Sequence, residues 1–194
     1  MPWPPNLPEN QSPLPDYIRP GLNVLFVGFN PGERSAAIGH HYAGRNNRFW
    51  ELLDLAGFTE RRLRPEEDSL LLTFGYGLTN IVARWSKSSS DLRSREMFEG
   101  AELLRDKVAR FRPAIVGFCG KGVYQAYARL GSDPGVGYGR QDPPRVPGTI
   151  DFIMPSPSGR ATAPFAVKLH YFRELRLLVD SLQAHAGDLA GPSS

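Results

Sequence analysis

The sequence predicts one three-layer α/β/α domain, in which helices cover both faces of a mainly parallel sheet of about four strands. Two observations support this fold class. Four short apolar segments alternate with helical patterns along the 194 residues, as is typical of a parallel sheet. Each apolar segment also ends in a loop rich in Gly, Ser or Pro. Because the carboxyl ends of parallel strands meet at one edge of a sheet, we expect the four loops to surround a single cleft.

The first strand is expected at residues 22–28, LNVLFVG, and it runs directly into the loop GFNPG. Gly28 and Gly32 allow a close backbone approach, and Pro31 favours an extended conformation at Asn30. Asn30 is therefore expected at the rim on a stiff support. Its amide can orient a water molecule or a base edge, but it cannot act as a strong base. The same residues also fit an ordinary turn after a strand.

A small, polar and irregular segment, residues 33–46, leads from this loop to a helix. Asn46 or Asn47 has the residue type of an N-cap for that helix, and Gly57 has the residue type that ends one. The apolar side of the helix follows helical spacing and is expected in the core. It consists of Phe49, Trp50, Leu53 and Ala56.

The second strand is expected at residues 77–82, GLTNIV, and the polar loop ARWSKSSSD follows it. A helix with apolar positions between residues 97 and 111 comes next. Asp91 stands between the loop and this helix and allows two interpretations. It either caps the helix, as Ser90 also could, or it reaches the cleft and helps to activate a water molecule.

The third and fourth strands are expected at residues 114–118 and 149–154. The third leads into Gly-Lys-Gly and a helix, but the GxxxxGK[ST] spacing of a nucleoside-triphosphate loop is absent. Residues 131–148 are rich in Gly and Pro and are expected to form a long loop or hairpin. The fourth strand leads into PSPSGRATAP and a final helix at about residues 165–184.

The domain is expected at residues 21–184, as a monomer. Residues 1–20 hold seven prolines and are expected to form an extended arm, and residues 185–194 a flexible tail. The single cysteine, Cys119, excludes an intrachain disulfide and a cysteine-based zinc cluster. It is expected to be buried and inert, although its place near the rim also allows it to line the cleft.

A net charge of +3 and a pI near 9.2 are compatible with a nucleic-acid partner. No apolar stretch reaches the roughly 18 residues of a membrane span, and the first residues lack the layout of a signal peptide. We therefore expect no membrane partner and a cytoplasmic location, near the nucleoid in a bacterium or in the nucleus of a eukaryote.

Three motifs occur in order: GFNPG at residues 28–32, RSAAIGHHYAGRNNRFWELLDLAGF at residues 34–58 and MPSPSGRA at residues 154–161. Together they resemble the mismatch-specific uracil-DNA glycosylase and thymine-DNA glycosylase family. The marks of that family are a GINPG loop, a small-residue stretch that ends in an aromatic residue and NRFW, and a late (N/M)P(N/S)xS(G/A) loop. The resemblance extends from Leu22 to Leu182 and implies the uracil-DNA glycosylase-like fold.

Enzymes of this family flip uracil, or thymine mispaired with guanine, out of double-stranded DNA and hydrolyse its N-glycosidic bond. The resemblance implies the same monofunctional activity here, on DNA with U:G or related mismatches, and an abasic site as the product. Extrusion is a physical requirement, because a duplex hides the reacting carbon. No cofactor and no metal ion are implied, and the positions of His40, His41 and His170 do not form a metal-binding pattern.

The resemblance also assigns roles to residues. Asn30 would hold the attacking water, and Tyr42 would stack on the flipped base. Phe29 would lend backbone groups to the uracil edge, with Gly28 and Ser35 as further candidates for base binding. The DNA would be contacted by Ser156, Ser158, Gly159 and Arg160, and by Lys87 of the polar loop. Arg160 would fill the space that the base leaves or meet the orphaned guanine.

Three positions depart from the pattern of the bacterial mismatch enzymes. Ser156 and Arg160 resemble the thymine-glycosylase branch, and Tyr42 adds a hydroxyl to the usual phenylalanine, so an altered substrate range is open. The alternative function is a non-catalytic DNA- or damage-binding module on the same fold, against which the intact Asn30 argues. A nucleotide-binding enzyme is a third interpretation, and the missing phosphate-loop spacing disfavours it.

Overall fold

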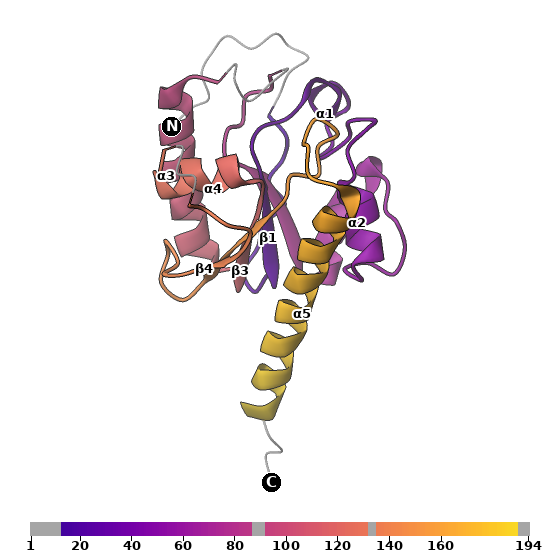
Figure 1. Cartoon of the computed structure of the whole chain (residues 1–194), viewed down its shortest axis with the longest axis vertical. Helices are drawn as coiled ribbons and strands as arrows, with labels where there is room; N and C mark the ends of the chain where they lie inside the picture. Colours follow the sequence, from indigo (N-terminus) through magenta and orange to yellow (C-terminus); the bar gives the residue numbers. More distant parts are fainter. Residues whose placement is uncertain (1–12, 87–91, 132–134, 190–194) are drawn as a thin grey trace.

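A computed structural model describes residues 13–86, 92–131 and 135–189. Its middle layer is a five-stranded sheet of order β2-β1-β3-β5-β4 (Figure 1). Four strands are parallel: β1 (Val24–Gly28), β2 (Tyr76–Asn80), β3 (Ile115–Cys119) and β5 (Ile150–Met154). The edge strand β4 (Gly139–Gln141) runs antiparallel to β5. The prediction of a mainly parallel sheet is confirmed.

Five strands replace the expected four because β4 lies in the segment expected as a long loop or hairpin. It is only three residues long, and it has no apolar run that a sequence pattern could detect. It joins the sheet through its pairing with β5, where Arg140 lies opposite Phe152.

Helices cover the sheet on both faces (Figure 1). The helices α3 (Ser94–Phe111) and α4 (Lys121–Ala128) lie on one face. The helices α2 (Phe49–Leu55) and α5 (Phe165–Leu189) lie on the other. A 3₁₀-helix η1 (Pro65–Phe74) precedes β2, and the short helix α1 (Glu33–Ile38) sits above the end of β1.

Strand β1 divides the core into two halves, because successive side chains of a strand point to opposite faces. Val24 and Phe26 belong to the cluster under α2 and α5, whereas Leu25 and Val27 belong to the cluster under α3 and α4. All four are fully buried. In the first cluster, Phe49 and Trp50 lie in the core as predicted, with 0% and 4% of their surface exposed.

One local expectation is wrong. Residues 33–38 form helix α1 rather than irregular chain, although the helix is too short to show a periodic pattern. Helix α3 begins at Ser94 with Arg93 as its N-cap, and the expected caps Ser90 and Asp91 lie outside the described residues. The Glu96 carboxylate accepts a hydrogen bond from the Arg93 N–H at 2.8 Å and so stabilises this start of the helix.

The segment before β1 packs against the domain. Tyr17 exchanges two backbone hydrogen bonds with Leu78 of β2, both 2.9 Å long. The Asp16 carboxylate accepts a hydrogen bond from the Thr79 hydroxyl at 2.6 Å and pairs with Lys107 of α3. The chain at Tyr17 therefore pairs with the sheet edge at β2 through one isolated antiparallel bridge. None of the described helices is long and apolar enough to cross a membrane.

Candidate active site

A cleft of about 800 Å³ opens at the carboxyl ends of β1 and β3. This is where a parallel sheet is expected to bind ligands, because the chain leaves β1 toward β2 but leaves β3 toward β5. The two connections diverge, and the space between them stays open. The cleft is lined by the loop after β1, by the residues before α2, by the start of α4 and by the loop after β5.

Asn30 is held at this cleft by its side-chain nitrogen, whose two N–H groups are shared among three acceptors. Its Nδ2 donates to the carbonyl oxygens of Pro31 and Arg84 at 3.1 and 3.2 Å, and to the hydroxyl of Ser86 at 2.9 Å. Arg84 and Ser86 follow β2, so two neighbouring strands fix one amide. Backbone bonds join the same two loops, including Val82 N–H to the Phe29 carbonyl at 2.9 Å.

These partners fix which end of the Asn30 amide carries the nitrogen. Carbonyl oxygens can only accept, so the amide atom that faces Pro31 and Arg84 must be the donor. The Oδ1 atom then points away from them, and no described residue donates a hydrogen bond to it. A carbonyl oxygen held in this way can accept a hydrogen bond from a water molecule and orient it, without taking its proton.

Gly28 leaves room for two polar groups at the floor of the cleft. A Cβ at this position would lie 2.5 Å from Oδ1 of Asn80 and 3.1 Å from the hydroxyl oxygen of Tyr42. Asn80 ends β2 and was not singled out in the sequence. It follows an apolar strand beside β1, so the rule that identified Asn30 could have identified it as well.

Tyr42 reaches the floor in a stacked position. Its ring lies on the ring of Phe49, with centroids 3.8 Å apart and planes inclined by 16°, and its hydroxyl donates to Sγ of Cys119 at 3.3 Å. Phe49 covers one face of the ring, and the residue still lines the cleft. Cys119 is buried, as expected, and it also lines the cleft.

The loop that carries Tyr42 is tied down at several points. Tyr42 has a φ of 53°, a left-handed conformation that a bulky residue rarely adopts without support. The Ser35 hydroxyl accepts a hydrogen bond from the Ala43 N–H at 2.9 Å, and the Asp68 carboxylate accepts one from the His41 N–H at 2.9 Å. Ser35 lines the cleft as well, so its position is as expected, although its oxygen is engaged in holding this loop.

The loop after β5 closes the other side of the cleft with Ser156, Ser158, Gly159 and Arg160. The hydroxyl of Ser156 accepts from the Ser158 N–H at 3.3 Å, and that of Ser158 accepts from the Arg160 N–H at 3.2 Å. Both serines thus shape a turn that presents Gly159 and Arg160 at the surface.

The structure brings together nine of the eleven candidate residues, and all nine line this cleft. They are Gly28, Phe29, Asn30, Ser35, Tyr42, Ser156, Ser158, Gly159 and Arg160. The other two, Lys87 and Asp91, lie outside the described residues. Leu14, Glu33 and Lys121 also line the cleft and were not among the candidates. Leu14 comes from the proline-rich segment, whose composition gives no sign of such a position.

The described lining residues offer little strong acid or base. Burial raises the pKa of the Cys119 thiol to about 12, and burial together with Cys119 raises the pKa of Tyr42 well above its usual value. Burial lowers the pKa of His41, whose Nε2 is engaged with the Pro15 carbonyl at 2.9 Å. Glu33 is the one carboxylate among the described lining residues, and it is exposed. The site therefore suits a reaction in which polar groups position water and stabilise charge.

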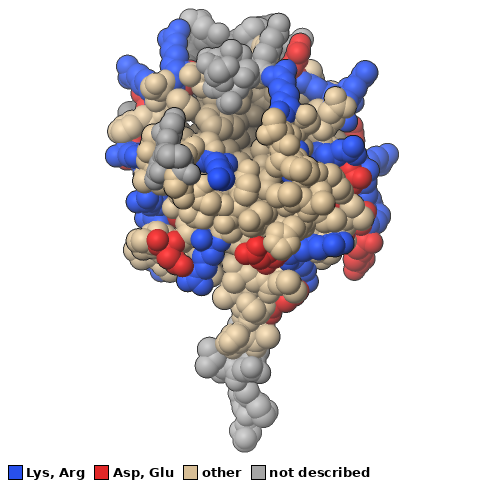
Figure 2. All heavy atoms as spheres, in the orientation of Figure 1, with Lys and Arg blue, Asp and Glu red and all other residues tan. Residues whose placement is uncertain are grey.

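Across the described ranges, no group of three or more His, Cys, Asp or Glu side chains lies together as a metal site would require. In Figure 2 the middle of the visible face is mostly uncharged, and Lys and Arg side chains lie along both flanks with some Asp and Glu among them.

An α/β domain with a polar cleft at the switch point of its sheet is thus defined. The model of the uracil DNA glycosylase superfamily matches residues 15–177, and the chain belongs to this superfamily of DNA glycosylases that act on uracil. A solved structure from Methanosarcina acetivorans, provisionally described as a uracil DNA glycosylase, is 18% identical with a TM-score of 0.56. The match covers 86% of this chain and 98% of the other, and it supports the fold.

Proposed function

We propose that the protein is a monofunctional DNA glycosylase of the mismatch-specific type, which removes uracil from duplex DNA, preferentially opposite guanine. Mispaired thymine is a second substrate class. The single observation that carries the proposal is the fixed amide of Asn30, whose Oδ1 faces away from all three partners of Nδ2 at the cleft. The GFNPG, NRFW and PSPSGR segments that resemble this type all border the cleft.

The proposed chemistry uses the orienting amide of Asn30 and needs no strong acid or base from the described lining residues. In the proposed reaction the oxygen of a water molecule bonds to C1′ of the deoxyribose, the C1′–N1 bond breaks, and its electron pair leaves with the uracil anion. The water loses one proton to solvent, and the base gains one. Uracil is an acidic leaving group, so an orienting amide and donors to the departing base suffice where ordinary glycosides need two carboxylates.

Tyr42 supplies the surface on which the extruded base stacks, because Phe49 fixes its ring from behind. Asn80, beside Gly28 and Tyr42, supplies an amide for the edge of the base. Arg160 stands at the exposed tip of the loop after β5, where it fills the gap in the duplex or contacts the orphaned guanine. Extrusion of a mismatched base costs less than that of a paired one, which favours U:G over U:A.

The test uses end-labelled duplexes with U:G, U:A or T:G and excess enzyme, followed by alkali to cut abasic sites. Wild type is expected to cut U:G fastest, and Asn30→Ala to lose on the order of 100-fold or more in the single-turnover rate. Glu33→Gln is the matched control, because a general base contributes roughly 100-fold or more. We expect it to lose less than about tenfold. Binding of the duplex without any cut would support the non-catalytic module instead.

A further inference from the structure

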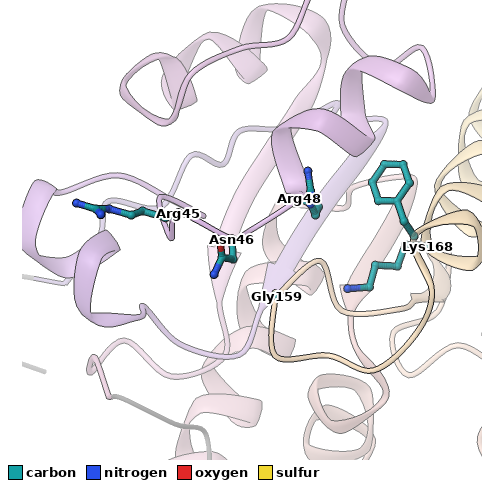
Figure 3. A pocket seen from close by; sticks show the side chains of 6 residues that line it. Arg45, Asn46, Arg48, Gly159 and Lys168 are labelled. Atoms are coloured by element: carbon teal, nitrogen blue, oxygen red, sulfur yellow. The ribbon is translucent and has the colours of Figure 1, made fainter.

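Lys168, on the first turns of α5, is almost entirely buried, with 5% of its surface exposed. Its Nζ donates to two carbonyl oxygens of the loop after β5, that of Ser158 at 3.0 Å and that of Ala161 at 3.4 Å. Figure 3 shows the side chain extended from α5 toward Gly159 in this loop. One ammonium group therefore holds both ends of the turn that carries Arg160.

The same loop is fixed from its other side by the residues before α2. The Arg48 N–H donates to the Pro157 carbonyl at 2.9 Å. Gly159 packs so closely on Asn46 that a Cβ would lie 2.6 Å from the Cβ and 2.7 Å from the carbonyl oxygen of Asn46. Within residues 156–161, only Gly159 and Arg160 are exposed. The loop is thus clamped between α5 and the start of α2.

The position of Lys168 is costly for a cation. Burial and the like charge of Arg48 both lower the pKa of the Lys168 ammonium. The neighbouring pocket is lined by Arg45, Asn46, Arg48, Gly159, Phe165 and Lys168, and none of these is an acid (Figure 3). Glu51 pairs with Arg48 at 2.7 Å rather than with Lys168. Among the described residues, the only partners of the Lys168 ammonium are therefore carbonyl oxygens of this loop. This indicates that Lys168 acts on the loop itself.

We propose that Lys168 is a positioning residue that holds the loop of residues 156–161 in its DNA-binding conformation before DNA arrives. The expected effect of Lys168 on base release rests on the proposed function, whereas its effect on the loop conformation does not. A loop ordered in advance loses little entropy when it meets the duplex, so Arg160 enters the gap more readily. Lys168 contacts neither the base nor the attacking water. It acts by holding Ser158 and Ala161, and thereby positions Arg160.

The clamp is tested without DNA by amide hydrogen exchange of the intact protein. A proteolytic peptide that covers residues 155–162 then reports exchange in the loop. Lys168→Met keeps the length of the side chain and removes its donors. We expect exchange of the Arg160 and Ala161 amides to become about tenfold faster or more, because two charge-assisted hydrogen bonds are lost. The strands should exchange as in wild type. Lys107→Met, which removes a lysine from the opposite face, should leave the loop unchanged.

The effect on function is tested with a double-mutant cycle. On a U:G duplex, Lys168→Met is expected to slow single-turnover base release by between about tenfold and a hundredfold. In the Arg160→Ala background the same change should cost less than about threefold, because both substitutions disable one loop. A general structural defect would give the same loss in both backgrounds. Lys168→Gln keeps an NH₂ donor and is a milder change. Its rate of base release should lie between those of wild type and Lys168→Met.

The outcomes separate the two proposals. If wild type releases no base from any duplex, the proposed function is wrong, and the exchange experiment still decides on the clamp. If wild type is active but neither methionine nor glutamine at position 168 changes loop exchange, the inference on Lys168 is overturned. It is also overturned if the loss in rate is equal with and without Arg160.

Discussion

At the scale of single residues, the orientation of one amide decides what the cleft can do. Asn30 receives its orientation from carbonyls of its own loop and of the loop after β2, so its environment fixes oxygen and nitrogen before any substrate binds. An oxygen fixed in this way loses little freedom when it orients a water molecule. The catalytic role proposed for Asn30 therefore depends on groups that never touch the DNA.

Gly28 gives a direct test of the floor of the cleft. In Gly28→Ala the new Cβ would meet Oδ1 of Asn80 at 2.5 Å and displace it together with the Tyr42 hydroxyl. We expect base release from a U:G duplex to fall by between about tenfold and a hundredfold, since small misplacements have effects of that size. Gly32→Ala is the control, because no atom lies within 4 Å of a Cβ there. Equal rates for the two variants would contradict this view of the floor.

Asp151 provides a prediction about stability, far from the cleft. It is fully buried, its Oδ2 accepts a hydrogen bond from the Arg145 N–H at 2.9 Å, and its Oδ1 has no hydrogen-bond partner among the described residues. Burial raises its pKa from 3.8 to about 6. The folded protein therefore binds this proton more tightly than the unfolded chain does. The contribution of the Asp151 carboxyl to the free energy of unfolding is fully present below pH 3.8 and is lost as the pH rises through about 6.

Asp151→Asn should accordingly be more stable than wild type at pH 8, by up to about 3 kcal/mol. The gain should shrink as the pH falls and be close to zero near pH 4. Urea unfolding at several pH values measures it. Asp106→Asn, which removes one negative charge from an exposed position of α3, is the control for the change in net charge. A variant that is less stable than wild type at pH 8 would show that the charged form is favoured in the fold.

At the scale of secondary structure, helix α3 determines where the loop after β2 lies. Gly100 sits within this helix, and a Cβ on it would lie 2.0 Å from the carbonyl oxygen of Ile81. The helix axis thus approaches the chain directly before Arg84 and Ser86, which hold Asn30. A glycine inside a helix costs about 1 kcal/mol relative to alanine, so the close approach explains its presence.

Gly100→Ala should therefore lower the stability by about 1 to 3 kcal/mol, although alanine favours helix. The melting temperature should fall, and base release should fall with it, because the partners of Asn30 shift. Gly137→Ala, at a position with no atom within 4 Å of a Cβ, should leave both unchanged. A more stable Gly100→Ala variant would mean that helix propensity outweighs the contact with Ile81.

The elements also show what a sequence can predict. The strands β1 (VLFVG) and β3 (IVGFC) are continuous apolar runs, and such runs indicate buried strands. The strands β2 (YGLTN) and β5 (IDFIM) contain polar residues but remain largely apolar. The helix α1 and the strand β4 are six and three residues long, and they show no periodicity. Asn30 could be found because a strand and a turn signal point to it. Lys168 could not, because its partners are backbone carbonyls of a loop ten and seven residues before it.

At the scale of the whole molecule, the order of the strands in the sheet determines where the cleft lies. The loop after β1 and the loop after β3 diverge because β1 lies between β2 and β3. Segments that are far apart in the sequence, from Leu14 to Ala163, then converge on one opening. The fold therefore collects polar groups that are far apart in sequence, and the membership in the uracil DNA glycosylase superfamily agrees with this arrangement.

In the proposed reaction, a water molecule held by Asn30 attacks the sugar of an extruded uracil. The most direct measurement is mass spectrometry of both products after reaction of a U:G duplex with stoichiometric enzyme in ¹⁸O-labelled water. We expect one equivalent of unlabelled free uracil and an abasic sugar that carries the label, with almost no product from Asn30→Ala. The catalytic role proposed for Asn30 is wrong if no base is released, or if Asn30→Ala releases uracil at the rate of wild type.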